Sequence, residues 1–162
     1  MPSDREPHDP SPLLVELAGN LPPGRALDLA CGAGRHTLHL ARLGWQVTAV
    51  DIEPEKIRQL RAAAEPNLAI DAIVADLENH EFTIEPNAYD LVCDFYYLQR
   101  DLFPRIREGV RPGGAIAAAI LLTGRFALQS GELRTLFAGW KILYYSESPT
   151  PRPTARLIAR KA

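Results

Sequence analysis

The stretch Arg25–His36 constrains this chain more than any other. It reads as a short apolar strand, then a turn that contains Gly32 and Gly34, and then the start of an amphipathic helix. Glycine has no Cβ, so its backbone can approach a ligand closely and can adopt left-handed conformations. Asp28 is an acidic residue within the otherwise apolar strand. A strand that leads through a glycine-rich turn into a helix N-terminus is a common way for an α/β protein to hold a nucleoside cofactor.

Length and composition limit the classes of protein to consider. The 162 residues fit one domain with a buried core, and we expect a single domain over residues 1–162, with residues 1–10 as a flexible leader. The net charge of −2 gives no broad basic field for nucleic acid or an anionic membrane. No apolar run reaches the roughly 20 residues of a membrane span. The two cysteines, Cys31 and Cys93, are too few for a disulfide framework, so a reducing cytoplasm is the expected compartment.

Apolar periodicity and turn residues predict strands that alternate with helices. The predicted strands are 26–30, 46–50, 69–75, 89–93 and 115–122, followed by 140–147 and 156–160. The predicted helices begin at Pro12, Arg35, Pro54, Leu102 and Glu132. Strands joined by helical crossovers run parallel, whereas the last two strands, joined by a proline-rich turn at 148–153, must be antiparallel neighbours. Arg111–Gly114 is predicted to turn the chain into the fifth strand.

Polar or glycine residues follow four consecutive predicted strands. They are Cys31–Gly34, Asp51, Asp76 with Leu77, and Asp94–Arg100. The carboxyl ends of parallel strands form the edge at which open α/β sheets bind ligands. A single aspartate there is as readily a helix cap or a solvated turn, but the ordered set favours a binding site. Asp51 could accept two hydrogen bonds from a ribose diol, in an NAD site or in another adenosine site.

The glycine turn helps to separate these cofactors. A dinucleotide fingerprint, G-x-G-x-x-G, would need a third glycine where the chain has Thr37. The pattern Asp28-x-Ala30-x-Gly32-x-Gly34 instead resembles motif I of the class I S-adenosylmethionine (SAM) methyltransferases, in which small residues alternate after an acidic one. The chain also lacks a Tyr-x-x-x-Lys pair. A nicotinamide-dependent oxidoreductase is therefore the less favoured alternative.

The resemblance extends over most of the chain. Matching segments are Val47–Asp51, Ala75–Glu78, Tyr89–Val92 and Leu102–Gly114. Asp28–Arg35 and Tyr97–Phe103 are similar to the small TehB-like (tellurite-resistance-type) bacterial methyltransferases. The resemblance implies an α/β fold: a Rossmann-like doubly wound sheet of about seven strands, five parallel plus a C-terminal antiparallel pair, with helices on both faces.

The family pattern also implies roles for individual residues. Gly32 and Gly34 should lie against the methionine part and the ribose of SAM, Asp51 should bind the ribose hydroxyls, and Asp28 should orient the turn or, through water, the cofactor ammonium group. Asp76 should accept from the adenine amino group, although a cap on its own polar loop is the alternative. The full set of expected cofactor residues is Asp28, Ala30, Cys31, Gly32, Gly34, Asp51, Ile52, Asp76, Leu77 and Asp94.

Two features of this pattern depend on local geometry. Ala30 stands where the family has its first glycine, and its methyl group is tolerated if φ there is negative. His36 either contacts the ligand or lies at the surface in the first turn of its helix. No metal site is expected, because no histidines or cysteines have ligand spacing.

On the substrate side, Tyr97 and Arg100 are the candidate catalytic residues, facing the transferable methyl group and a substrate anion. The alternatives are that Tyr97 is an aromatic residue at the edge of the core and that Arg100 forms a solvent-exposed pair with Asp101. The predicted function is a SAM-dependent methyltransferase that acts on a small-molecule nucleophile and releases S-adenosylhomocysteine. Because the segment 122–130 is short for a substrate cover, a SAM-binding protein without catalysis stays open, as does a homodimer.

Overall fold

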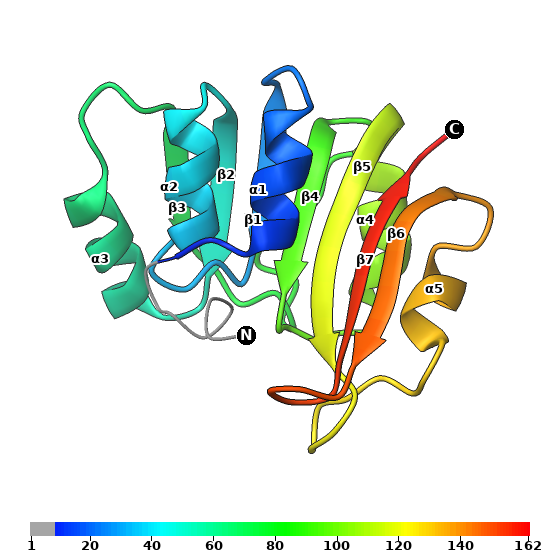
Figure 1. Cartoon of the computed structure of the whole chain (residues 1–162). Coiled ribbons are helices and arrows are strands. Elements are labelled where there is room, and N and C mark those ends of the chain that lie inside the picture. Colours follow the sequence, from blue (N-terminus) through cyan, green and yellow to red (C-terminus); the bar gives the residue numbers. More distant parts are fainter. Residues whose placement is uncertain (1–8) are drawn as a thin grey trace. The chain divides into compact units, whose positions relative to one another are not determined.

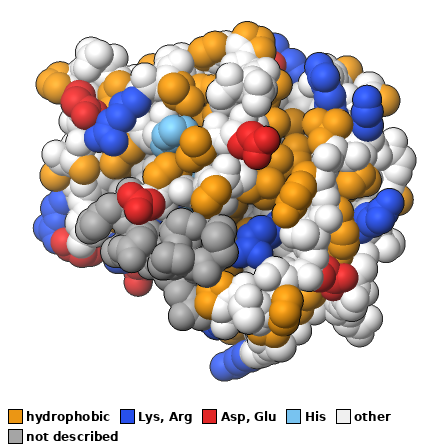
Figure 2. All heavy atoms as spheres, in the orientation of Figure 1, with side chains coloured by type: hydrophobic (Ala, Val, Ile, Leu, Met, Phe, Trp, Pro, Cys, Tyr) orange, Lys and Arg blue, Asp and Glu red, His pale blue; other side chains and the backbone are white. Residues whose placement is uncertain are grey.

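The structure, a computed structural model, describes residues 9–162, which contain seven strands and five helices (Figure 1). The chain comprises two compact units, Met1–Thr83 and Ile84–Ala162. Residues 1–8 of the predicted leader lie outside the described residues, and one domain over the whole chain stays a prediction. Within the described part, no helix has the length and apolar run needed to cross a membrane. On the face drawn in Figure 2, acidic and basic side chains are scattered among hydrophobic ones.

The first unit is a parallel three-stranded arrangement in the order β3-β2-β1. Its strands are β1 (Arg25–Leu29), β2 (Gln46–Asp51) and β3 (Ile70–Val74), and its helices are α1 (Pro12–Gly19), α2 (Arg35–Arg42) and α3 (Pro54–Ala63). Pro12 and Pro54 stand at the start of their helices, where the missing N–H costs no hydrogen bond. Ile57 and Leu60 of α3 pack with Ala49 and Ala72 of the strands.

His36 does not lie at the surface, which is one of the two positions considered from the sequence. It is buried, and its Nε2 accepts a hydrogen bond of 3.0 Å from the backbone N–H of Ser11. The side chain of Ser11 makes no capping bond to α1. The surface position considered for His36 is therefore wrong: the residue joins the start of α1 to the start of α2.

The second unit contains the predicted antiparallel pair. Its strands are β4 (Tyr89–Phe95), β5 (Val110–Leu121), β6 (Lys141–Ser148) and β7 (Thr154–Arg160), and its helices are α4 (Leu102–Gly109) and α5 (Glu132–Leu136). The order is β4-β5-β7-β6, with β4 and β5 parallel and β5, β7 and β6 antiparallel to one another. Phe137 packs edge-on against Phe103 and Trp140 in the core of this unit.

Two details differ from the sequence prediction. Arg111–Gly114 does not turn the chain before the strand but lies inside β5, as an irregular stretch where the pairing jumps from Tyr89↔Val110 to Leu91↔Ala115. Gly113 adopts a φ of +86° there, a conformation that favours glycine. The fourth strand also runs to Phe95, so that Asp94 lies within β4 instead of following it.

Candidate functional site

The glycine turn of the first unit is tied to the end of β2 by backbone hydrogen bonds. The N–H of Cys31 donates to the carbonyl of Val50 (2.9 Å), and the N–H of Gly32 donates to Oδ2 of Asp51 (2.8 Å). The N–H of Gly34 donates to the carbonyl of Cys31 (3.0 Å) and closes the turn. The predicted cofactor residues of motif I and of the second strand are therefore brought together.

Gly32 and Gly34 differ in the space around them. Both are left-handed, with φ of +58° and +87°. A Cβ built on Gly32 would have no atom within 4 Å, whereas one built on Gly34 would collide with the side chain of Leu60. Gly34 is therefore needed for packing of the turn against α3. Gly32 is the position where the bare backbone faces open space, as a site for a closely approaching ligand requires.

The carboxylate of Asp51 is only partly used within the protein. Oδ2 accepts from Gly32, and Oδ1 accepts from the N–H of Glu53 at 2.9 Å. An ionised carboxylate offers about four lone-pair positions, so about two remain. Asp51 is half-buried, which leaves them within reach of a ligand. The residue can hold the turn and still accept hydrogen bonds from a diol.

Ala30 does not meet the condition set by the sequence. Its φ is +53°, in the left-handed region that a residue with a Cβ adopts at a cost of roughly 1–2 kcal/mol. The condition of a negative φ is therefore not met, and residue 30 has the backbone conformation that glycine favours although it is alanine.

Ala30→Gly is therefore expected to stabilise the protein. Glycine relieves the left-handed strain at this position but gives the unfolded chain more conformational freedom. The net increase in the free energy of unfolding should be about 1 kcal/mol, which raises Tm by about 2–4 °C. Thermal unfolding of the variant and the wild type measures this difference. An unchanged or lower Tm would show that the alanine methyl group makes compensating contacts.

Asp28 is buried in β1 and bonded to the residue that replaces the third glycine. Its Oδ2 accepts a hydrogen bond of 2.7 Å from the hydroxyl of Thr37, which is fully buried. Burial raises the pKa of Asp28 from 3.8 to about 6, although the Thr37 hydrogen bond and the charge of Arg35 lower it. A buried carboxylate close to the turn would be stabilised by a cationic ligand.

Asp28→Asn is expected to stabilise the ligand-free protein at neutral pH. The folded pKa of about 6 lies above the unfolded value of 3.8, so the unfavourable contribution of Asp28 is absent below about pH 4 and complete above about pH 7. The difference between these two pKa values corresponds to about 3 kcal/mol, and asparagine can still accept from Thr37. Denaturant unfolding should show this gain at pH 7 and none near pH 4; an equal gain at both pH values would contradict the assignment.

Asp76 caps its own loop in this structure. Oδ1 accepts from the N–H of Glu78 (3.0 Å), and Oδ2 accepts from the side-chain amide of Asn79 (3.1 Å). The capping alternative is therefore realised, and the contact with an adenine amino group stays a prediction. Leu77 is buried, whereas Ile52, directly after Asp51, is 58% exposed. Such an exposed apolar side chain is available to pack against a ligand ring.

The Cys31 thiol is not activated as a nucleophile. Burial raises the pKa of the Cys31 thiol, and the charges of Asp28 and Asp51 raise it further. Cys31 is half-buried, Cys93 is buried, and both are free of disulfides. A thiol held protonated is a poor nucleophile, which fits a packing role.

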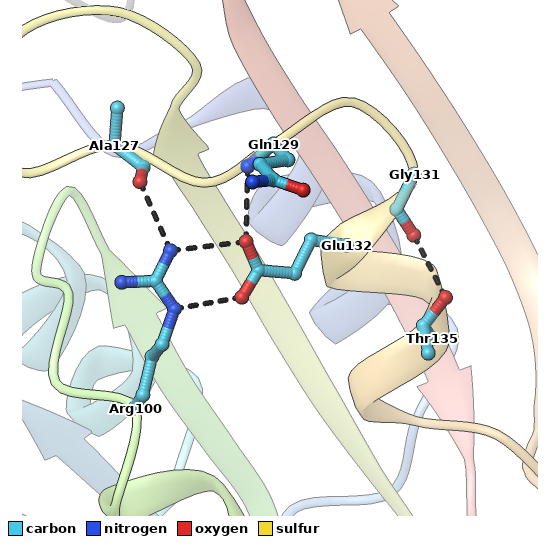
Figure 3. A network of polar contacts seen from close by, with 6 residues as sticks. All are labelled: Arg100, Ala127, Gln129, Gly131, Glu132 and Thr135. Carbon is cyan, nitrogen blue, oxygen red and sulfur yellow. Dashed lines mark hydrogen bonds and ion pairs between the residues drawn. The ribbon is translucent and has the colours of Figure 1, made fainter.

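The candidate residues of the second unit lie on and after β4. Asp94 is buried within the strand. The hydroxyl of Tyr97 donates to Oε1 of Gln99 (2.6 Å), and Tyr97 is half-buried. Arg100 forms a bidentate ion pair with Glu132 (Figure 3). The distances are 2.7 Å from Nε to Oε2 and 3.0 Å from Nη2 to Oε1. Contacts of Tyr97 and Arg100 with a substrate stay predictions.

The sequence interpretation did not identify the roles of two residues. Thr37 was considered only as a missing glycine, although its spacing of three from Leu40 places it on the buried stripe of α2, a signal that it faces the core. Glu132, the partner of Arg100, lies 32 residues away and carries no local signal.

Comparison with known proteins identifies the family. Residues 26–114 match the family described as Methyltransferase domain. The chain belongs to this methyltransferase family. Over 83% of its length it is 31% identical to the probable S-adenosyl-L-methionine-dependent methyltransferase TehB of Haemophilus influenzae, and it covers 52% of that protein. It is also 33% identical, over 62% of its length, to the ubiquinone biosynthesis O-methyltransferase of Xanthomonas campestris, of which it covers 44%.

Solved structures confirm the fold of this methyltransferase-family chain. TehB of Haemophilus influenzae superimposes with a TM-score of 0.82 at 24% identity, over 92% of this chain and 61% of that one. A Burkholderia thailandensis 1,6-didemethyltoxoflavin-N1-methyltransferase with bound S-adenosylhomocysteine gives 0.73 at 21% identity, over 93% and 77%. The Rossmann-like fold predicted from the sequence is confirmed. The chain spans about half the length of the curated relatives it matches.

Proposed function

We propose that this chain is a SAM-dependent methyltransferase that transfers a methyl group to a small-molecule nucleophile by direct displacement. The observation that carries the proposal is the turn at Gly32, whose open backbone face is fixed by the hydrogen bond to Asp51. SAM, when bound, supplies a methyl group activated by its positively charged sulfur. Alignment of the acceptor can then provide much of the rate enhancement.

The residues divide into groups by the part of the cofactor that each would hold. Asp51 accepts from the ribose hydroxyls with its remaining lone pairs, and Gly32 lets the ligand approach the backbone. Asp28 provides negative charge below the turn. The other residues predicted to contact the cofactor shape the walls of its site and the end that holds the adenine. They are Ala30, Cys31, Gly34, Ile52, Asp76, Leu77 and Asp94. Two of the similar proteins support a small acceptor by their names, which refer to ubiquinone biosynthesis and to 1,6-didemethyltoxoflavin.

A soft nucleophile such as a thiolate fits the candidate residues best, because it needs no general base. Oxygen and nitrogen nucleophiles usually require one, and we assign none. Tyr97 and Arg100 are proposed on the acceptor side. Methyl transfer from SAM to a panel of thiols, amines, catechols and metalloid oxyanions tests the proposal: production of S-adenosylhomocysteine with one class supports it.

A second candidate function is SAM binding without catalysis, as in a sensor or a subunit. It is favoured by the short segment after β5 and by the pairing of Arg100 with Glu132. Binding of S-adenosylhomocysteine without turnover on the whole panel would support it over the enzyme. We further propose that residues 1–162 act as one domain in the cytoplasm. The TehB superposition, which covers 92% of the chain, supports the single domain, and the lack of a disulfide at Cys31 and Cys93 supports the compartment.

A further inference from the structure

Arg100 links two loops of the second unit. One loop, residues 96–101, follows β4, and the other, residues 122–131, follows β5. Besides its ion pair with Glu132, the guanidinium donates from Nη2 to the carbonyl of Ala127 at 3.2 Å (Figure 3). One side chain from the first loop thus holds both the middle of the second loop and the helix that follows it.

Glu132 fixes the second loop from its other end. Its Oε1 accepts from the N–H of Gln129 (3.0 Å) as well as from Arg100. The N–H of Glu132 in turn donates to the carbonyl of Gln129 (3.0 Å). The hydrogen bonds from Arg100 and Gln129 hold the pKa of Glu132 down at about 2, so the carboxylate stays ionised at every pH near neutrality.

These loops occupy the edge of the sheet at which ligands bind. Phe95 pairs with Ala119 in parallel register, and the N–H of Tyr96 donates to the carbonyl of Ala119. The carboxyl ends of β4 and β5 therefore meet, and ligands in open α/β sheets bind outside such ends. The first loop carries Tyr97, and the second carries Phe126, which is 64% exposed.

We propose that Glu132 is a positioning residue, which acts through Arg100 to hold residues 122–131 against the loop after β4 and so fixes the surface that receives the methyl acceptor. This inference rests on the proposed methyltransferase function. In place of a longer insert, the chain uses a short segment. Backbone hydrogen bonds of Leu122 and Leu128 anchor its first part to Pro153 and Leu121. The ion pair of Arg100 with Glu132 adds the contacts at Ala127 and Gln129. The pair should affect acceptor binding but not cofactor binding, because the cofactor turn belongs to the first unit.

Glu132→Gln tests the inference because it removes the charge and keeps the shape. Trypsin can cut after Arg125, which is exposed in the loop, and local opening controls such cleavage. We expect cleavage of the Arg125–Phe126 bond to be about threefold to fivefold faster in the variant, as loss of an exposed ion pair allows. Glu65→Gln is the matched control, since Arg42 and Glu65 form a similar ion pair at 3.0 Å in the first unit.

Two further measurements separate this inference from the proposed function. Calorimetry with S-adenosylhomocysteine should give equal affinities for wild type and Glu132→Gln. In methyl transfer to a thiol, the variant should raise the KM of the thiol and leave the KM of SAM unchanged. Cleavage no faster than in Glu65→Gln, or a lower kcat with an unchanged thiol KM, would overturn the inference alone. Failure of the wild type to bind S-adenosylhomocysteine would overturn the proposed function and the inference with it.

Discussion

Gly34→Ala is expected to lower Tm by about 10 °C. The new Cβ would collide with Cδ1 of Leu60 and lie 3.0 Å from its Cγ. Leu60 is fully buried among Ile57 and the β-strand alanines, so it has little room to move. Overpacking should cost about 1–3 kcal/mol and left-handed strain about 1–2 kcal/mol, so the free energy of unfolding should fall by about 3 kcal/mol. Each kcal/mol corresponds to about 2–4 °C in Tm for a chain of this size.

Gly32→Ala is the matched control, and it should separate stability from binding. Gly32 is also left-handed, but a Cβ there would have no neighbour within 4 Å. Its stability cost is therefore limited to the backbone strain, about 1–2 kcal/mol. The added methyl group would instead occupy the face proposed for the cofactor, so binding of S-adenosylhomocysteine should be lost. Unchanged binding by Gly32→Ala would show that the cofactor does not lie against this turn.

Asp51→Ala is expected to weaken S-adenosylhomocysteine binding by at least about a hundredfold. Two hydrogen bonds from ribose hydroxyls to a carboxylate are worth roughly 1.5–3 kcal/mol each, and a tenfold change in Kd corresponds to about 1.4 kcal/mol. The variant also loses the acceptors for the N–H groups of Gly32 and Glu53, so a moderate decrease in Tm should accompany the loss. Calorimetric titration measures the affinity, and thermal unfolding shows whether the fold survives.

Glu53→Ala provides the control for Asp51→Ala. Glu53 is an exposed acidic neighbour whose backbone N–H, and not its side chain, bonds to Asp51. Its removal should leave the affinity unchanged. A loss of affinity in Glu53→Ala equal to that in Asp51→Ala would mean that net negative charge near the turn, and not hydrogen bonding by Asp51, controls binding.

Local signals were sufficient to predict most of the fold. Proline at the start of α1 and α3 and apolar runs for the parallel strands each placed an element near its observed bounds. The interior irregularity at Arg111–Gly114 could not be predicted, because it arises from pairing with β4. Burial of His36 likewise depends on the backbone of Ser11, 25 residues earlier.

The sequence was sufficient to predict the part of the candidate site in which residues of suitable chemistry stand at the ends of neighbouring strands. Gly32 lies just after β1 and Asp51 is the last residue of the neighbouring β2, so their contact follows from the parallel pairing of these strands. The conformation of Ala30 was not predictable, because the backbone there follows the turn and not the preference of alanine. The pairing of Arg100 with Glu132 depends on how two distant loops meet after β4 and β5.

Binding of a SAM-type ligand at the turn is the central claim, and titration of the wild type with S-adenosylhomocysteine and with NAD⁺ tests it most directly. A ligand that binds only the folded state stabilises it by about 2.7 kcal/mol at a hundred times Kd, or about 5–10 °C in Tm. We expect saturable binding and a rise of this size with S-adenosylhomocysteine and none with NAD⁺. Binding of NAD⁺ with no response to SAM or S-adenosylhomocysteine would contradict the account.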